Sequence, residues 1–293
     1  MPKIVLGEYK MDEIKCSISI SLYQFKRWMI NPRIYVIFIS IFLYLHSLLS
    51  PIITFCSNSG YDITPFLFPY IMCQPITVTL IMLGVILLFC DAPFIGPEQP
   101  YIIIRSGRKT WVLGNILYLA LASIVFFLLI ILFIIIILFP VIEFSWGWGK
   151  VIGTFAQTAL ASQHGISIPF PQVIFTSYTP LQSMLLTFIN NCLVSFMLGI
   201  TIFTLNLKLS RVTGVIGAVI PVLWQMTVTK TWTGFIRYSP VSWVSLANID
   251  AFSNSLYPSH QYVYIVLCSV SLTLSFLSIV FILKKDIQVL KSV

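Results

Sequence analysis

The sequence predicts an all-α membrane protein that crosses the bilayer several times. Of its 293 residues, 58% are hydrophobic and only 9% are charged, and the mean hydropathy is +0.96. A typical soluble domain is about 25% charged, so most of this surface is expected to face lipid. Apolar runs of about 20 residues are typical of transmembrane helices, because the hydrocarbon core is about 30 Å thick and each helical residue rises about 1.5 Å.

Six apolar runs of this kind follow one another along the chain. The predicted spans cover about residues 34–56, 66–90, 111–142, 181–207, 212–229 and 262–283. The third run is longer than a bilayer requires, so it should tilt or project from the membrane. We expect one transmembrane domain over residues 1–293, in which residues 1–33 precede the first span and lie in the cytoplasm.

Charge predicts how these spans are oriented. Fourteen lysines and arginines fall in the N-terminal segment, in two alternate loops and in the C-terminal tail, whereas the opposite side carries only Lys150, Lys230 and Arg237. Basic residues concentrate on the cytoplasmic side of multi-pass proteins. The protein is therefore expected in the cell membrane with both termini in the cytoplasm. Nucleic-acid binding is not expected, since it would need a clustered basic domain.

The segment before the first span has the pattern of an amphipathic helix. Its apolar stripe consists of Ile18, Leu22, Phe25 and Met29, and the residues roughly opposite are Ser17, Gln24 and Arg27. This pattern predicts a helix over about residues 17–30 that lies in the inner membrane interface. Pro32 disfavours a helical conformation at Asn31 and should allow a turn into the first span.

Two segments on the predicted outer side are longer than simple turns. Residues 143–180 contain the sequences WGWGK and IPFPQ, and residues 230–261 contain TWTGF and YSPVSWVSL. Tryptophan and tyrosine are enriched where membrane proteins meet the interface. We expect short interfacial helices here, with a re-entrant segment before the last span and an outer cap or partner site over residues 143–180.

The sequence lacks the residues that several functional classes need. All nine acids fall outside the middle of the predicted spans, and His46 is the one ionisable residue in a span that could relay protons, which disfavours an ion-coupled secondary transporter. We find no hydrolase nucleophile motif, zinc-protease motif or phosphate-binding loop. No catalytic residue and no metal site is therefore expected, and this chain should not bind ATP itself.

Neutral polar residues remain inside the spans. Such side chains either join neighbouring helices or line a pathway, and the sequence leaves both alternatives open. The fourth span carries Ser183, Thr187, Asn191 and Ser195 at intervals of four residues; the second carries Gln74, Thr77 and Thr79, and the fifth carries Gln225 and Thr227.

Three stretches of sequence suggest a family. They are DAPFI at 91–95, PYIIIRSGRKTWVLGNILYL at 100–119 and SPVSWVSL at 239–246. Together with the predicted topology, they resemble the permease subunit of a bacterial ATP-binding-cassette exporter, of the six-span class that exports polysaccharides, drugs or peptides. The resemblance extends over nearly the whole chain.

This resemblance implies a division of labour between subunits. A separate ATPase subunit would bind ATP and Mg²⁺, and this permease would pair with a second copy of itself or with a related permease. The loop between spans two and three would dock on the ATPase through Asp91, Pro93, Glu98, Arg105, Arg108 and Lys109. The interfacial helix would add a second contact through Phe25, Arg27 and Trp28. Candidate pathway residues are Gln74, Thr77, Thr187, Asn191, Gln225 and Thr227.

The expected function is thus the membrane-spanning half of an ATP-driven exporter for an amphipathic or peptide-like substrate. The main alternative is a membrane sensor or assembly scaffold that transports nothing, in which case the bases of the 91–111 loop only orient the chain. An intramembrane enzyme is a further alternative that lacks visible catalytic groups.

Overall fold

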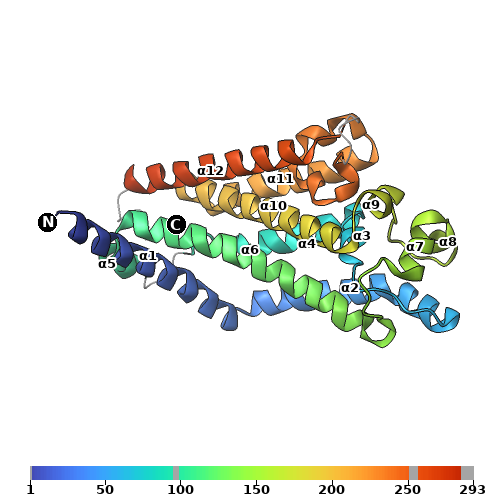
Figure 1. Ribbon diagram of the computed structural model, residues 1–293. Coiled ribbons are helices and arrows are strands. Elements are labelled where there is room, and N and C mark those ends of the chain that lie inside the picture. The colour runs from blue at the N-terminus through green and yellow to red at the C-terminus, as the bar shows by residue number, and fades with distance from the viewer. Residues whose placement is uncertain (1, 95–98, 251–256, 285–293) are drawn as a thin grey trace.

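The computed structural model describes residues 2–94, 99–250 and 257–284, and within these ranges the chain is helical with no strands (Figure 1). The α-helices are α1 (Pro2–Lys26), α2 (Pro32–Ser59), α3 (Phe68–Ile71), α4 (Pro75–Phe89), α5 (Gln99–Ser106), α6 (Arg108–Leu138), α7 (Gly149–Gln157), α8 (Leu160–Gln163), α9 (Gln172–Ser177), α10 (Pro180–Lys208), α11 (Arg211–Lys230) and α12 (His260–Lys284). Short 3-10 helices are η1 (Arg27–Met29), η2 (Phe139–Val141), η3 (Thr233–Tyr238), η4 (Pro240–Val244) and η5 (Leu246–Asn248).

Five helices are long and apolar enough to cross a membrane: α2, α6 with η2, α10, α11 and α12. They coincide with five of the six predicted spans, which confirms an all-α polytopic architecture. Polar residues begin several of them. Asn31 precedes α2 in an extended conformation and its side chain accepts a hydrogen bond from the backbone N–H of Arg33, as expected for an N-cap followed by proline.

The second predicted span, residues 66–90, is not one helix. It is divided into α3 and the 15-residue α4, and α4 is shorter than a membrane-crossing helix. The cause is Pro75, because the residue before a proline is driven out of the helical region. Gln74 has φ −84° and ψ 117°, so the helix restarts at Pro75. A continuous second span was therefore a wrong expectation.

The chain nevertheless returns along the bundle through α3 and α4. Arg33 at the start of α2 is paired with Asp91 just after α4, at what we call the α5 end of the bundle. At the opposite end, Ile63 after α2 exchanges backbone hydrogen bonds with Val141 and Glu143 after α6. Arg108 at the start of α6 contacts the carbonyl oxygens of Ile282 and Leu283 near the end of α12. The N-terminus and the end of α12 thus both lie at the α5 end (Figure 1).

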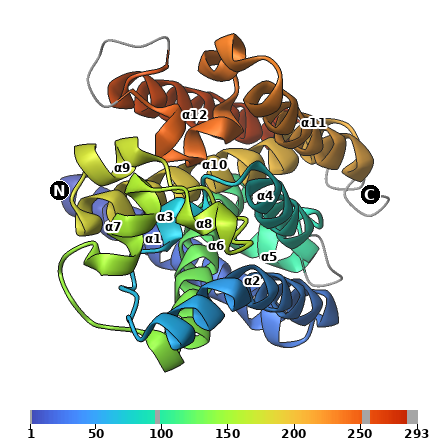
Figure 2. The same ribbon diagram turned by 90° about the vertical axis from the view of Figure 1, so that its right-hand side faces the viewer.

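Helix α10 lies at the centre of the bundle and is the most buried of the five long helices. It packs against α4, α6, α11 and α12, and Figure 2 shows it between α12 above and α6 below. Small polar pairs cross these contacts, with Ser195 donating to Ser123 of α6 at 3.1 Å and Thr204 bonded to Ser278 of α12 at 2.7 Å. Small hydroxyl residues allow close packing of membrane helices.

Large apolar side chains cover the outside of this bundle. Exposed examples are Val36, Ile39 and Leu43 on α2; Leu128 and Leu132 on α6; Ile216 and Ile220 on α11; and Leu272 and Phe276 on α12. A water-soluble monomer rarely exposes apolar surface on every side. The exposed surface therefore supports a multi-pass membrane protein.

A helix is present where the sequence predicts one, but α1 begins earlier, ends at Lys26 and packs lengthwise against α6, so it does not lie across the bundle as a helix in the membrane interface would (Figure 1). Its polar face is turned inward, with Ser17, Ser21 and Gln24 buried. Its apolar face is turned outward, where Ile18 and Leu22 are exposed. The approach to α6 is close, because a Cβ on Gly114 would lie 2.8 Å from Ile20.

At the end opposite to α5, residues 143–180 fold over the bundle as α7, α8 and α9, and we call this unit the cap (Figure 1). The stretch before α12 folds back into the same end. Its η4 residues Val241, Ser242, Trp243 and Val244 are almost wholly buried. Trp243 donates its indole N–H to the Ile236 carbonyl at 2.9 Å and its own carbonyl accepts from Asn190 of α10. The predicted short helices are therefore present.

Candidate functional site

The four residues Asp91, Ala92, Pro93 and Phe94, which we call the DAPF loop, connect α4 toward α5. The loop turns back on itself, with the Phe94 N–H donating to the Asp91 carbonyl at 2.7 Å. Ala92, Pro93 and Phe94 are buried. Three separate parts of the chain hold this loop, and each supplies a polar side chain.

The first anchor is Arg33 at the start of α2. Its guanidinium donates to the Asp91 carboxylate at 2.8 Å and also to the Cys90 thiol. Asp91 is thus the acidic partner of Arg33. The side chains of Arg33 and Asp91 are 39% and 42% exposed, so the pair fixes the start of the loop more than it stabilises the fold.

The second anchor joins the end of α1 to the loop. Arg27 donates to the Phe94 carbonyl at 2.7 Å, and the Phe94 ring meets the buried Tyr118 edge-on at 5.1 Å. Trp28 donates its indole N–H to the Tyr118 hydroxyl at 2.7 Å, and Phe25 packs on both rings. Of the three predicted residues, Arg27 thus bonds the DAPF loop directly, and Phe25 and Trp28 pack on Tyr118, which in turn contacts Phe94.

The third anchor is Asn206 near the end of α10, which is only 1% exposed. Its side-chain N–H donates to the Ala92 carbonyl at 2.6 Å. Its side-chain oxygen accepts from the backbone N–H of Gly214, in the first turn of α11, at 3.1 Å. One side chain therefore bonds the loop and the next helix together, and both its donor and its acceptor are used inside the protein.

Helix α5 makes residues 99–106 of the 91–111 loop helical. The chain then turns into α6 at Gly107, whose φ is 83°. Only one face of α5 is packed: Ile103 is 2% exposed, whereas Tyr101 and Ile104 are 76% and 70% exposed. Arg105 and Lys109 are exposed beside them. The result is an apolar and basic surface at the α5 end.

The remaining predicted coupling residues are placed differently. Asp91 and Pro93 belong to the anchored loop, and Glu98 lies outside the described residues. Arg108 is half-buried and its guanidinium is bonded to α12 carbonyl oxygens. The free basic groups at this surface are thus Arg105 and Lys109, for which no bonding partner is seen among the described residues.

The six candidate pathway residues do not gather in one place. On α4, Thr77 bonds Gln74 and Tyr44 of α2, whereas Thr79 on another face bonds Gln225 of α11. Thr227 is exposed on α11. Thr187 and Asn191 are fully buried in α10, where the Thr187 hydroxyl and the Asn191 side-chain oxygen have no hydrogen-bond partner among the described residues.

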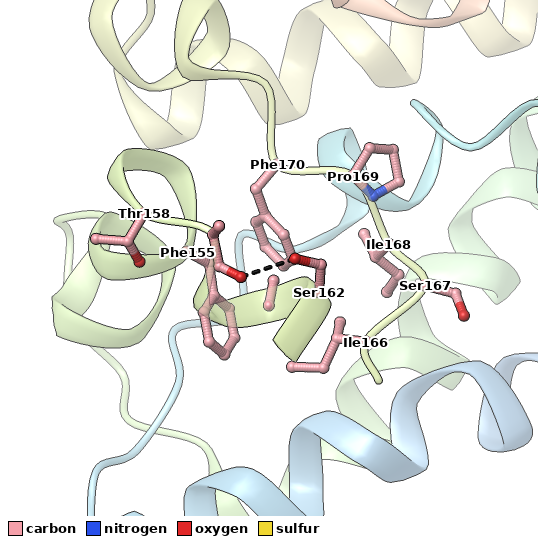
Figure 3. A pocket seen from close by; sticks show the side chains of 10 residues that line it. Phe155, Thr158, Ser162, Ile166, Ser167, Ile168, Pro169 and Phe170 are labelled. Atoms are coloured by element: carbon pink, nitrogen blue, oxygen red, sulfur yellow. Dashed lines mark hydrogen bonds between the residues drawn. The ribbon is translucent and has the colours of Figure 1, made fainter. Parts of the chain in front are cut away.

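A cavity of about 330 Å³ opens in the cap (Figure 3). Phe155, Ile166, Ile168 and Phe170 supply its apolar wall, and Ser162 donates to the Ala159 carbonyl at 2.8 Å within it. No charged side chain lines this cavity. It can accommodate a small apolar group without selecting for charge.

The described residues contain no group of three His, Cys, Asp or Glu side chains placed to hold a metal ion. No protein-family model, no curated protein and no solved structure matches the chain.

Sequence reasoning missed four residues of this site: Arg33, Tyr118, Asn206 and Ile104. Arg33 was counted only as an orientation signal, although an Arg and an Asp at neighbouring span ends on one predicted side could have suggested the pair. Tyr118 and Asn206 lie within apolar helices and gave no signal. Ile104 has the polarity of a core residue, and only the structure shows that it is exposed.

Proposed function

We propose that this protein is the membrane-spanning subunit of an ATP-driven exporter, and that α5 docks on a separate ATPase subunit. The observation that carries the proposal is the contrast within one connection: the DAPF loop is held from three sides, while the next helix exposes Tyr101, Ile104 and Arg105. A held loop that presents an uncovered helix is suited to receive a force from a partner and pass it into the bundle.

The chemistry of α5 agrees with a protein partner. Aromatic residues and arginine are enriched in protein interfaces, and arginine binds carboxylates with two parallel hydrogen bonds. In this proposal the chain crosses the membrane six times, with the broken α3–α4 segment as the second crossing and the α5 end in the cytoplasm. ATP and Mg²⁺ are bound by the partner, and a second permease completes the pathway for an amphipathic or peptide-like substrate.

The test is purification of the tagged chain from its native membrane, followed by mass spectrometry and an ATP hydrolysis assay of the eluate. We expect an ATP-binding-cassette ATPase that is retained by the unmodified chain and lost with Ile104→Asp combined with Arg105→Glu. Arg108→Glu is unsuitable, because Arg108 also bonds α12.

The matched control is Lys150→Glu, which reverses an exposed charge in the cap and should keep the ATPase. An eluate without any ATPase, or one whose ATPase is indifferent to the α5 substitutions, would overturn the proposal. That result would favour a membrane sensor or assembly scaffold.

A further inference from the structure

A second feature of the α5 end concerns how a displacement of the DAPF loop would spread through the bundle. Of the three anchors of the DAPF loop, only Asn206 also bonds a third element, the first turn of α11. Arg33 and Arg27 bond the loop from α2 and from the end of α1, so they tie it to elements that precede it in the chain.

Helices α10 and α11 approach each other closely at Asn206. A Cβ on Gly214 would lie 2.7 Å from the Ile202 carbonyl oxygen of α10 and would also clash with the Asn206 side chain. The turn between the two helices is short, and Ser210 and Thr213 close it with reciprocal hydrogen bonds. Position 214 therefore requires glycine, and the Asn206 amide fills the space that a side chain would take.

Helices α4 and α11 are joined again nearer the cap. Thr79 of α4 donates to Gln225 of α11 at 3.2 Å, and the two helices pack along the length between. The two helices run in opposite directions, so the loop after α4 meets the start of α11. Hydrogen bonds at both ends make the pair resist sliding, because each bond is directional and short.

From this geometry we infer that Asn206 is a positioning residue that makes the DAPF loop and α11 one mechanical unit. A displacement of the DAPF loop reaches α11 through the Ala92 carbonyl, the Asn206 amide and the Gly214 N–H. The inference deepens the proposed function, on which it relies only for what displaces the loop. The connection itself belongs to the isolated chain and can be measured without any partner.

The test is hydrogen exchange with mass spectrometry on the purified chain in lipid nanodiscs. Arg33→Met loosens the loop from the α2 side without touching α10 or α11. We expect it to speed amide exchange about fivefold both in the loop and in residues 212–216, since protection follows local opening. In an Asn206→Leu background, Arg33→Met should speed exchange in the loop alone.

If Asn206 had only a structural role, no such dependence would appear. Asn206→Leu would then raise amide exchange in α11 by the same factor whether or not Arg33→Met was present. The matched control is Asn190→Leu, a fully buried asparagine of the same helix near the cap, which should preserve the effect of Arg33→Met on α11.

If Asn206→Leu does not fold, Asn206→Ala serves instead, since it removes both the donor to Ala92 and the acceptor for Gly214 without adding bulk beside Gly214. The inference is overturned if Arg33→Met leaves amide exchange in α11 unchanged in the native background. It is also overturned if Arg33→Met still speeds exchange in α11 when Asn206 has been substituted. Loss of the ATPase in the purification experiment would leave this result untouched.

Discussion

Both ends of the bundle contain packed aromatic rings, but the α5 end adds an ion pair and further side-chain bonds to a loop. At the α5 end, an ion pair and side-chain bonds to backbone carbonyls fix the DAPF loop, with Arg33 and Asn206 as the main donors. In the cap, rings pack on rings: Tyr70 lies 5.4 Å from Trp148 and 5.0 Å from Phe170. Hydrogen bonds impose direction and position, whereas ring packing tolerates small shifts. The contacts at the α5 end therefore fix the position of the DAPF loop, whereas the contacts of the cap allow small shifts.

The largest loss of stability is expected from Gly114→Val, which forces α1 away from α6 at the α5 end. The new side chain would collide with Ile20 and with the Ser17 carbonyl, which lies 3.0 Å from a Cβ at this position. Overpacking of this kind costs about 2–3 kcal/mol. We expect a lower unfolding midpoint and faster proteolysis within α1. Gly234→Ala is the control, since a Cβ there meets nothing within 4 Å; equal loss in both variants would contradict the prediction.

Phe170→Ala should weaken the cap alone and by a smaller amount. The ring of this half-buried residue packs on Tyr70 and on Phe155, at 5.1 Å from the latter. Losing a partly buried aromatic ring costs about 2 kcal/mol, below the range for a full core position. Exchange should rise in residues 149–177 and stay unchanged in α5. A rise at both ends would show that the two ends are not independent.

Asp91→Asn should cost still less, because the pair with Arg33 is partly exposed. Pairs of this exposure are worth about 0.5–1 kcal/mol and are screened by salt. We therefore expect the difference in unfolding midpoint between variant and parent to shrink as NaCl rises from 50 mM to 1 M. A difference that is independent of salt would mean that hydrogen-bond geometry, and not charge, holds the loop.

The smallest effect on folding is expected from Arg105→Glu. Arg105 is exposed and belongs to the unpacked face of α5, and surface substitutions away from structural contacts usually change stability by about 0.5 kcal/mol or less. Its unfolding midpoint should match that of the parent protein. A clear loss of stability would show that α5 is a structural element, and would weaken its interpretation as a docking surface.

The sequence predicted the long elements well because their signal is strong. Five spans and the N-terminal helix depend on long apolar runs and a regular stripe, and these survive in the structure. The prediction of a continuous second span was wrong at Pro75, where the helix is broken although the apolar run has the length of a span. Hydropathy measures polarity over a window, so it cannot register a single backbone restriction.

Residue roles at the site were less predictable, since they depend on which side chains meet across the bundle. Phe25 lies on α1 and Arg27 and Trp28 follow it in η1, but Tyr118, to which Trp28 donates, lies 90 residues away in sequence. Asn206 gave no signal at all, because its importance follows from two backbone groups that only the fold brings within reach. Docking on an ATPase and the lining of a pathway stay predictions.

The inward polar face of α1 has a consequence for how the chain is made. Gln24 finds its partner Asn115 only 91 residues later, and synthesis proceeds at about 5–20 residues per second, so the first helix waits on the order of ten seconds before α6 exists. Throughout that interval its serines and glutamine have no partner on α6, while its apolar side can rest on the bilayer. The order of synthesis thus makes α1 a segment that docks on α6 late.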